Sequence, residues 1–100
     1  MDRVAATAAE PPAFVERPER GRFELDFGGG IAFASYRTEG NRLIVNHTEV
    51  PPAFEGRGVG SQLVRLLFEN ARATGRRIVP RCGFVAAWVR RHPEYADLVD

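Results

Sequence analysis

Apolar and polar residues alternate over residues 22–27, which predicts a strand with one buried face. Two further β-rich runs follow at residues 31–37 and 42–50, and short turns that contain glycine join all three. Turns of this kind connect neighbouring antiparallel strands. The first half of the chain is therefore predicted to form an antiparallel meander.

The hydrophobic period changes after Pro51 and Pro52, which end the third strand because proline cannot donate to a ladder. Apolar residues recur at helical spacing over residues 63–71, and Gly75 is a suitable end for that helix. A glycine-rich loop over residues 55–61 thus joins a strand to the start of the longest predicted helix.

A short strand at residues 76–82 and a second helix at residues 83–92 complete the pattern. The second helix is expected to turn four residues inward: Phe84, Val85, Trp88 and Val89. The predicted order is β-β-β-loop-α-β-α. The fold class is α/β, with a mainly antiparallel four-stranded sheet and two main helices.

Residues 1–21 show no clear period, so we predict a mobile N-terminal arm followed by one domain over residues 22–100. No apolar run reaches the roughly 20 residues that cross a bilayer, and the N-terminus lacks the apolar stretch of a signal peptide. Cys82 is the single cysteine, which fits a reducing cytoplasm. We expect a cytoplasmic protein without membrane contact, and favour a monomer.

All 14 basic residues are arginines, and the net charge is only +1. This choice indicates either anion binding or an arginine-biased genome. Five of the arginines gather between residues 76 and 91, where they could contact a phosphate, an acidic partner or RNA, or remain solvated: Arg76, Arg77, Arg81, Arg90 and Arg91. The near-neutral charge and the lack of stacking aromatics beside them argue against nucleic-acid binding.

The glycines at positions 56, 58 and 60 precede a helix N-terminus, where unpaired N–H groups favour a phosphate. A Walker loop is excluded because the chain has no lysine. The dinucleotide fingerprint is excluded because Ser61 and Leu63 stand where its third glycine is required. A glycine-rich turn without a ligand is the alternative.

The stretch EGRGVG at the start of a helix, after a meander, resembles the coenzyme A loop of the GNAT acetyltransferase superfamily. HTEVPPAFEGRGVGSQLV, followed by IVPRCGFVAAWVRRHPEYADLV, further resembles the small YjdJ-type GNAT-like family over residues 22–99. The resemblance implies a reduced GNAT fold that binds acetyl-CoA. It also implies a shortened C-terminus, which leaves the acceptor side open and favours a protein or peptide amine, or a polyamine.

The resemblance also implies which residues hold acetyl-CoA. The end of the third strand pairs with pantetheine, and the loop amides hold the pyrophosphate. Glu55 stands where the superfamily has Arg or Gln, so Arg57 is expected to supply the positive charge. The implied set is Thr48, Glu49, Val50, Phe54, Glu55, Gly56, Arg57, Gly58, Val59, Gly60 and Ser61; no metal ligand is assigned.

Glu49 and His47 are candidates for the group that removes a proton from the acceptor amine. Strand side chains repeat every second residue, so both lie on one face of the third strand. A carboxylate or an imidazole can act as a general base. The alternatives are a solvated carboxylate at Glu49 and a structural histidine at His47.

Cys82 is the third catalytic candidate, because a helix dipole and Arg81 beside it can both lower a thiol pKa. In the resembled family the cysteine of this motif lies near the acetyl group, which implies a covalent route. Gly83 replaces the proline that is common there. The alternative is an unreactive, partly buried thiol.

These observations predict an N-acetyltransferase that transfers acetyl from acetyl-CoA to an unidentified amine. A non-catalytic acyl-CoA-binding or protein-interaction module is the alternative.

Overall fold

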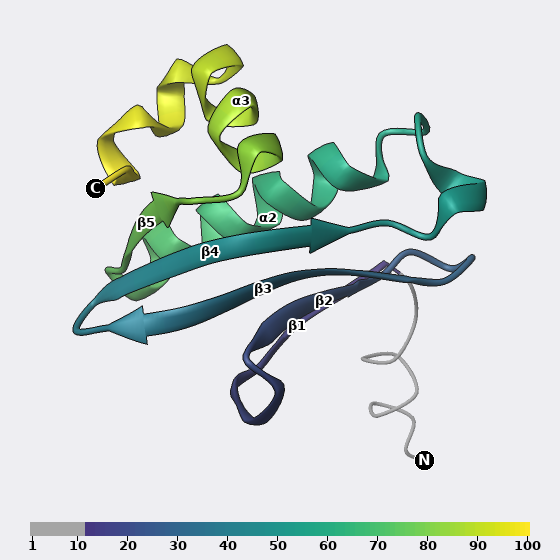
Figure 1. The fold of residues 1–100 in the computed structure, drawn as a ribbon, viewed down its shortest axis with the longest axis horizontal. Coiled ribbons are helices and arrows are strands. Elements are labelled where there is room, and N and C mark those ends of the chain that lie inside the picture. The colour runs from purple at the N-terminus through teal and green to yellow at the C-terminus, as the bar shows by residue number, and fades with distance from the viewer. Residues whose placement is uncertain (1–11) are drawn as a thin grey trace.

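Five strands form one sheet in the order of the sequence (Figure 1). In this computed structural model, which describes residues 12–100, they are β1 (Ala13–Arg17), β2 (Arg22–Asp26), β3 (Ile31–Glu39), β4 (Arg42–Glu49) and β5 (Arg77–Pro80). Strands β1 to β4 are antiparallel to their neighbours, and β5 is parallel to β4. The sheet is therefore mixed but mostly antiparallel.

The prediction of four strands is wrong, because residues assigned to the N-terminal arm form β1. Phe14 stacks on the buried Phe23 ring with centroids 5.4 Å apart. Glu16 faces the same side of the sheet, since it lies opposite Phe23 in the register. The stacking of Phe14 on Phe23 holds this strand to β2, and Glu16 joins it to Tyr36 of β3 and to Arg76. The remainder of the predicted mobile arm, residues 1–11, lies outside the described residues.

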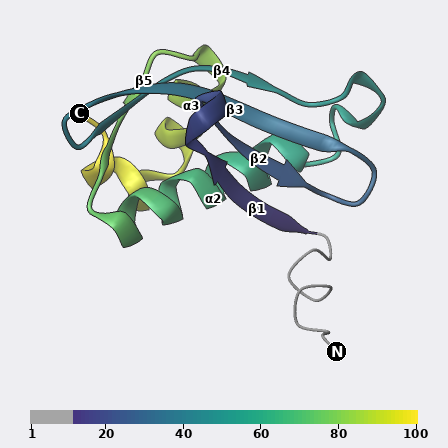
Figure 2. The same ribbon diagram turned by 90° about the horizontal axis from the view of Figure 1, so that it is seen from below.

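Two α-helices lie on one side of the sheet, α2 (Val59–Thr74) and α3 (Gly83–Arg91) (Figures 1 and 2). Helix α2 buries the predicted apolar stripe: Leu63, Val64, Leu67, Phe68 and Ala71. A 3-10 segment, η3 (Pro93–Leu98), packs beside α2 and α3. Shorter 3-10 turns are η1 (Pro18–Arg20) and η2 (Pro52–Phe54). No helix within residues 12–100 is long and apolar enough to span a membrane.

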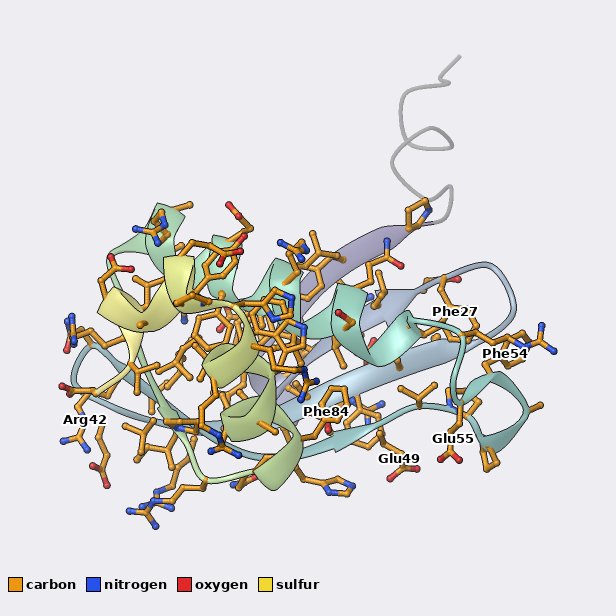
Figure 3. All side chains as sticks on the ribbon, turned by 90° about the horizontal axis from the view of Figure 1, so that it is seen from above. Phe27, Arg42, Glu49, Phe54, Glu55 and Phe84 are labelled. Carbon is orange, nitrogen blue, oxygen red and sulfur yellow. The ribbon has the colours of Figure 1, made fainter. Side chains whose placement is uncertain are left out.

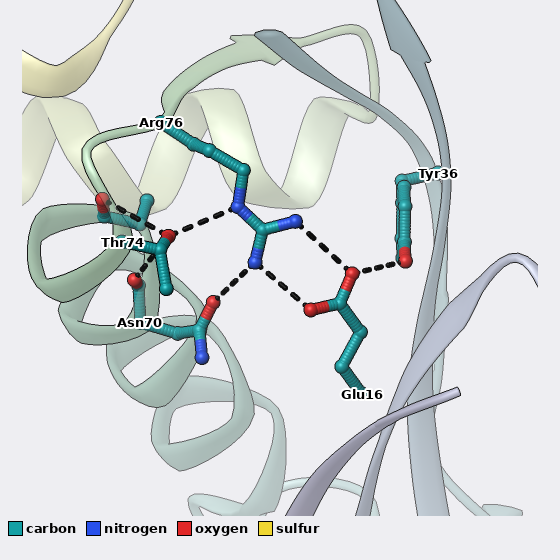
Figure 4. Close-up of polar contacts among 6 residues, drawn as sticks. Glu16, Tyr36, Asn70, Thr74 and Arg76 are labelled. Atoms are coloured by element: carbon teal, nitrogen blue, oxygen red, sulfur yellow. Dashed lines mark hydrogen bonds and ion pairs between the residues drawn. The ribbon is translucent and has the colours of Figure 1, made fainter. Parts of the chain in front are cut away.

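Arg76 joins β1 to the end of α2 (Figure 4). Its guanidinium bonds both carboxylate oxygens of Glu16, at 3.0 and 2.9 Å, and Asn70 Oδ1 at 2.8 Å. The Tyr36 hydroxyl donates to the same carboxylate. The hydrogen bonds from Arg76 lower the pKa of Glu16, burial raises it, and the bond from Tyr36 lowers it further. The pKa of Glu16 therefore lies below its ordinary value. Arg76 is thus a structural residue. It lies at the end of the sheet where β4 pairs with β5, which we call the closed end.

Strand β4 is divided by its neighbours. Its first half pairs with β3 and β5, and the β5 pairing stops at Val45 opposite Pro80. Beyond that point β4 continues to Glu49 against β3 only. A register shift opposite Ser35 marks the same position. The second half of β4 therefore has one edge that no strand of residues 12–100 covers.

One predicted core residue is not buried. Phe84 is 43% exposed, whereas Val85 and Trp88 are 0% and 1% exposed. Phe84 belongs to the first turn of α3, where the helix faces the loop before α2 instead of the core.

Candidate functional site

The loop before α2 is shaped by glycine. Gly56 and Gly58 have φ angles of 80° and 84°, which side-chain-bearing residues rarely adopt. Gly58 is the N-cap of α2, and no side chain caps this helix. The amides of a first helical turn have no intrahelical partner and carry the positive end of the helix dipole. The loop thus offers backbone donors suited to an anion.

A cavity of about 580 Å³ lies between this loop, the end of β4 and the face of α3. Its volume is in the range of small-molecule sites. Its lining residues are Thr48, Val50, Phe54, Glu55, Gly56, Gly58, Gly60, Ser61, Phe84, Trp88 and Arg91. The first eight belong to the predicted coenzyme site, and the last three do not.

Phe84 forms one wall of this cavity. A Cβ atom at Gly60 would lie 2.9 Å from Phe84 Cζ, so the missing side chain lets the ring lie directly against α2. Val50 lies on the other side, 3.6 Å from the same point. Gly60 therefore allows the close contact between Phe84 and α2, whereas Gly56 and Gly58 allow the positive φ angles of the loop.

Trp88 forms the floor between α2 and α3. Its Nε1–H donates to Ser61 Oγ at 2.8 Å, and its ring stacks on Phe68. The Ser61 hydroxyl keeps its own proton for a further acceptor. This hydrogen bond fixes the first turn of α2 relative to α3.

Two charged side chains line the cavity, Glu55 and Arg91. Arg57 is not among the lining residues, and its guanidinium lies 5.5 Å from the centre of the Phe54 ring. Arg91, from the end of α3, is the arginine that lines the cavity, and Glu55 is the lining carboxylate. Within the described chain, the arginine that lines the cavity thus comes from α3 and not from the loop.

Phe54 anchors the loop to the hairpin between β2 and β3, as Figure 3 shows. Its ring meets Phe27 edge-on at 4.9 Å between centroids. A Cβ atom at Gly29 would lie 2.6 Å from the Phe54 ring. The hairpin glycine is therefore required for this contact, which fixes where the loop begins.

Cys82 is half-buried at the N-cap of α3, with Sγ 3.6 Å from Thr48 Oγ1. Burial alone would raise the pKa of the thiol. Hydrogen bonds from Thr48 and from the amides of Val85 and Phe84 outweigh it, and the pKa lies below its ordinary value. This is the setting of a thiol with increased thiolate character. Thr48 also lines the cavity, so it links Cys82 to that space.

His47 and Glu49 lie together, as predicted, with Nε2 and Oε1 3.1 Å apart. Neither lines the cavity. They project from β4 to the side opposite Thr48, because successive strand residues alternate. Figure 3 shows Glu49 and Phe84 on opposite sides of the β4 ribbon. The structure thus separates the predicted catalytic residues into Cys82 on one side and the His47–Glu49 pair on the other.

Three residues of the predicted coenzyme site do not line the cavity: Glu49, Arg57 and Val59. The side chain of Val59 is buried in the core. Three lining residues were not assigned to the coenzyme site from the sequence, Phe84, Trp88 and Arg91, although Arg91 was among the arginines considered for phosphate contact. The i, i+4 spacing of Phe84 and Trp88 predicted core packing. The same spacing also places both residues on the helix face that lines the cavity. Among residues 12–100 no group of three His, Cys, Asp or Glu side chains could hold a metal ion.

Comparison with known proteins identifies the family. Residues 22–98 match the family described as GCN5-related N-acetyl-transferase. The fold is similar to the NMR solution structure of a GCN5-like protein from Staphylococcus aureus, with a TM-score of 0.68 and 24% sequence identity. That match covers 89% of this chain and 88% of the other, and at this identity it concerns the fold alone. The chain therefore belongs to the GCN5-related N-acetyltransferase family, in its small YjdJ-like form.

Proposed function

We propose that the protein binds acetyl-CoA in the cavity between α2, β4 and α3, and transfers the acetyl group to an amine. Family membership supports acyl-CoA as the donor. The observation that carries the proposal is the uncapped α2 N-terminus beside a cavity that is also lined by Thr48, whose hydroxyl lies 3.6 Å from Cys82 Sγ.

The anion-binding end suits the diphosphate of the coenzyme. The free amides of the loop supply directed donors, and Arg91 supplies a full positive charge. Glu55 opposes an anion by like charge, so the amides and Arg91 together carry the binding. Phe84 and Trp88 add an apolar wall for the arm that follows the diphosphate.

The uncovered edge of β4 suits the amide groups of that arm. Arg81 and Cys82 both donate to Val45 O, each at 3.0 Å, where β5 leaves the sheet. Beyond this point no strand of residues 12–100 pairs with β4 on the former β5 side, and the Thr48 amide bonds the Cys82 thiol. An extended ligand can pair there as a strand does, and this brings its thioester to Thr48.

Cys82 supports a covalent route. Its thiolate attacks the thioester carbonyl, a new C–S bond forms, and the bond to the coenzyme sulfur breaks, so that the coenzyme leaves as its thiolate. The acceptor nitrogen then attacks the acetyl-Cys82 carbonyl, its proton passes to a base, and the Cys82 sulfur leaves. Direct attack of the amine on the bound thioester is the alternative sequence of steps.

Glu49 suits the role of base on the acceptor side. The pairing of β4 with β5 ends at Val45, and beyond it Cys82 lies on one side of β4 and the His47–Glu49 pair on the other. A donor held on the helix side and an amine arriving from the opposite side can therefore meet there.

A non-catalytic acyl-CoA-binding module is the second candidate. The observation that favours it is the position of Glu49 and His47, which are 60% and 58% exposed and lie outside the cavity.

Calorimetric titration with coenzyme A, combined with an assay of acceptor-dependent coenzyme release, tests the proposal. We expect Arg91→Gln to weaken coenzyme binding about fivefold to tenfold, as expected for loss of one charge-assisted contact. Arg90→Gln is the matched control, because Arg90 is the preceding arginine of α3 and does not line the cavity. Absence of binding heat with well-folded protein would contradict the proposal. Binding without acceptor-dependent release would support the second candidate.

The covalent route has its own test. Intact-mass measurement after incubation with acetyl-CoA should show one added acetyl group, which is absent in Cys82→Ala. Full transfer activity in Cys82→Ala would exclude the covalent route and leave direct transfer.

A further inference from the structure

The side of the sheet opposite the helices carries its own set of aligned side chains. Residues that lie directly opposite one another in neighbouring strands project from the same face. The register places Arg17, Arg22, Ser35 and His47 in one row across β1 to β4. Val15, Glu24, Phe33 and Glu49 form the adjacent row. We call these two rows the open face.

One end of the open face is positively charged. Arg17, Arg20 and Arg22 all contact the Glu24 carboxylate, at 3.4, 3.0 and 2.8 Å. Despite its burial, these three bonds keep the pKa of Glu24 below its ordinary value, so the carboxylate stays charged. Three guanidinium groups around one carboxylate leave two positive charges without a counter-ion in the cluster. Each guanidinium donates one N–H group to Glu24, and its other N–H groups do not contact that carboxylate.

The other end of the open face is the His47–Glu49 pair, beyond the point where β4 stops pairing with β5. A line of contacts joins the two ends. The Arg22 guanidinium lies 4.4 Å from the centre of the Phe33 ring, and Phe33 meets His47 edge-on at 6.0 Å. A molecule lying along this line touches a cationic group at one end and the Glu49 carboxylate at the other.

We propose that the open face binds the acceptor, and that the acceptor is an amine carrying a carboxylate or phosphate about 10 Å from its nitrogen, a span of two strand spacings. The amine lies at Glu49, and the anionic group lies among Arg17, Arg20 and Arg22. This inference rests on the proposed acyl transfer and specifies its substrate class. It disfavours a polyamine, whose second amine would meet the arginines.

Space for the anionic group is present beside Arg17. A cavity of about 440 Å³ is lined by Ala13, Phe14, Val15, Arg17, Glu24, Asp26 and Ile31. Asp26 is at the far end of β2 from Arg22, and its carboxylate accepts a bond from the Gly28 amide. Its charge therefore directs the anion toward the arginine end.

A matched pair of acceptors tests this inference, 8-aminooctanoate and its carboxamide. They have equal length and the same amine, and they differ only in the negative charge. We expect the ratio of their kcat/KM values to favour the carboxylate about tenfold, as a charge-assisted arginine contact gives. The ratio should fall to near one in the double variant Arg17→Gln, Arg20→Gln. Arg37→Gln is the control, because Arg37 is also on an exposed strand position but pairs with Glu39.

A peptide pair distinguishes the source of the acceptor. Lysine followed two residues later by glutamate places both side chains on one side of an extended peptide, with Cα atoms about 7 Å apart and flexible side chains that can reach the proposed span. The glutamine counterpart lacks the charge. A preference for glutamate indicates a peptide acceptor, and a preference confined to 8-aminooctanoate indicates a small molecule. Equal use of charged and neutral acceptors in both pairs overturns the inference while acyl transfer stands.

Binding is measured alongside turnover, so that failure of the chemistry does not hide the result. Chemical shifts of the open-face amides are followed while each acceptor is added to protein saturated with coenzyme A. Weaker binding of the carboxamide, with the difference lost in the double variant, supports the inference even without turnover. Equal binding of both members overturns it. The calorimetric titration with coenzyme A reports separately on the proposed function.

Discussion

The two halves of β4 differ in almost every respect, although they are consecutive in sequence. Residues 42–45 pair on both edges, and Leu43, Ile44 and Val45 are buried. Residues 46–49 pair on one edge and are mostly exposed. The first half holds the sheet together, whereas the second half leaves backbone and side-chain groups free for a ligand.

The difference shows how so small a domain can hold a site. Contacts that stabilise the fold gather at the closed end, where Arg76 joins β1 to α2 and the chain end returns to β5. The glycine loop and Cys82 lie at the other end, where the sheet opens. Substitutions should therefore separate into those that reduce stability and those that reduce binding.

The largest effect is expected in the packed core. Leu67→Ala removes a fully buried side chain of α2 and should lower the free energy of unfolding by about 3 kcal/mol. Urea denaturation measures this loss. Coenzyme affinity of the fraction that remains folded should be unchanged, and a parallel loss of affinity would contradict the separation of the two regions.

Loss of the Glu16 carboxylate, the partner of Arg76, should have the next largest effect on stability. Glu16→Gln should lower the free energy of unfolding by about 2 kcal/mol at neutral pH, because a charge-assisted, partly buried pair is broken. The folded-state pKa of Glu16 is below its ordinary value of 4.5. Its stabilising effect is therefore present above that value and disappears as the pH falls through the folded pKa. Thermal unfolding of both proteins between neutral and acidic pH should converge, and a constant difference would contradict this account.

Two glycines at the ends of α2 allow a matched comparison. Gly58 and Gly75 both have positive φ, 84° and 71°, and at neither position would an added Cβ meet another atom within 4 Å. Each change to alanine should reduce stability by about 1 kcal/mol through backbone strain. Only Gly58→Ala should weaken coenzyme binding in calorimetry. Equal affinities in the two variants would mean that the loop holds no ligand.

The smallest effect concerns the thiol. Because hydrogen bonds lower the pKa of Cys82 below its ordinary value of 9.0, its alkylation by iodoacetamide should reach half-maximal rate below that pH. Thr48→Val removes the side-chain contact and should move the midpoint upward. An unchanged midpoint would assign the lowered pKa to the helix amides alone.

The sequence allowed much of the fold to be predicted because local patterns decide it. Alternation identified β2, and helical spacing identified the buried stripe of α2. β1 was missed because its inward-facing Glu16 looks polar, and the burial of that residue depends on Arg76, which is 60 residues away.

The candidate site was predictable only in part. The glycine loop is continuous in sequence, so its place at the start of α2 followed from the pattern. Arg91 and Phe84 reach the same cavity through the packing of α3 on α2, which no local pattern describes. The position of Cys82 and Glu49 on opposite sides of β4 likewise depends on where β5 leaves the sheet.

The hydrogen bond between Trp88 and Ser61 has a practical consequence. Trp88 is the single tryptophan of the chain, and one edge of its indole contacts the cavity while the rest is in the core. Its fluorescence emission is therefore a built-in optical reporter of cavity occupancy, readable in unlabelled protein.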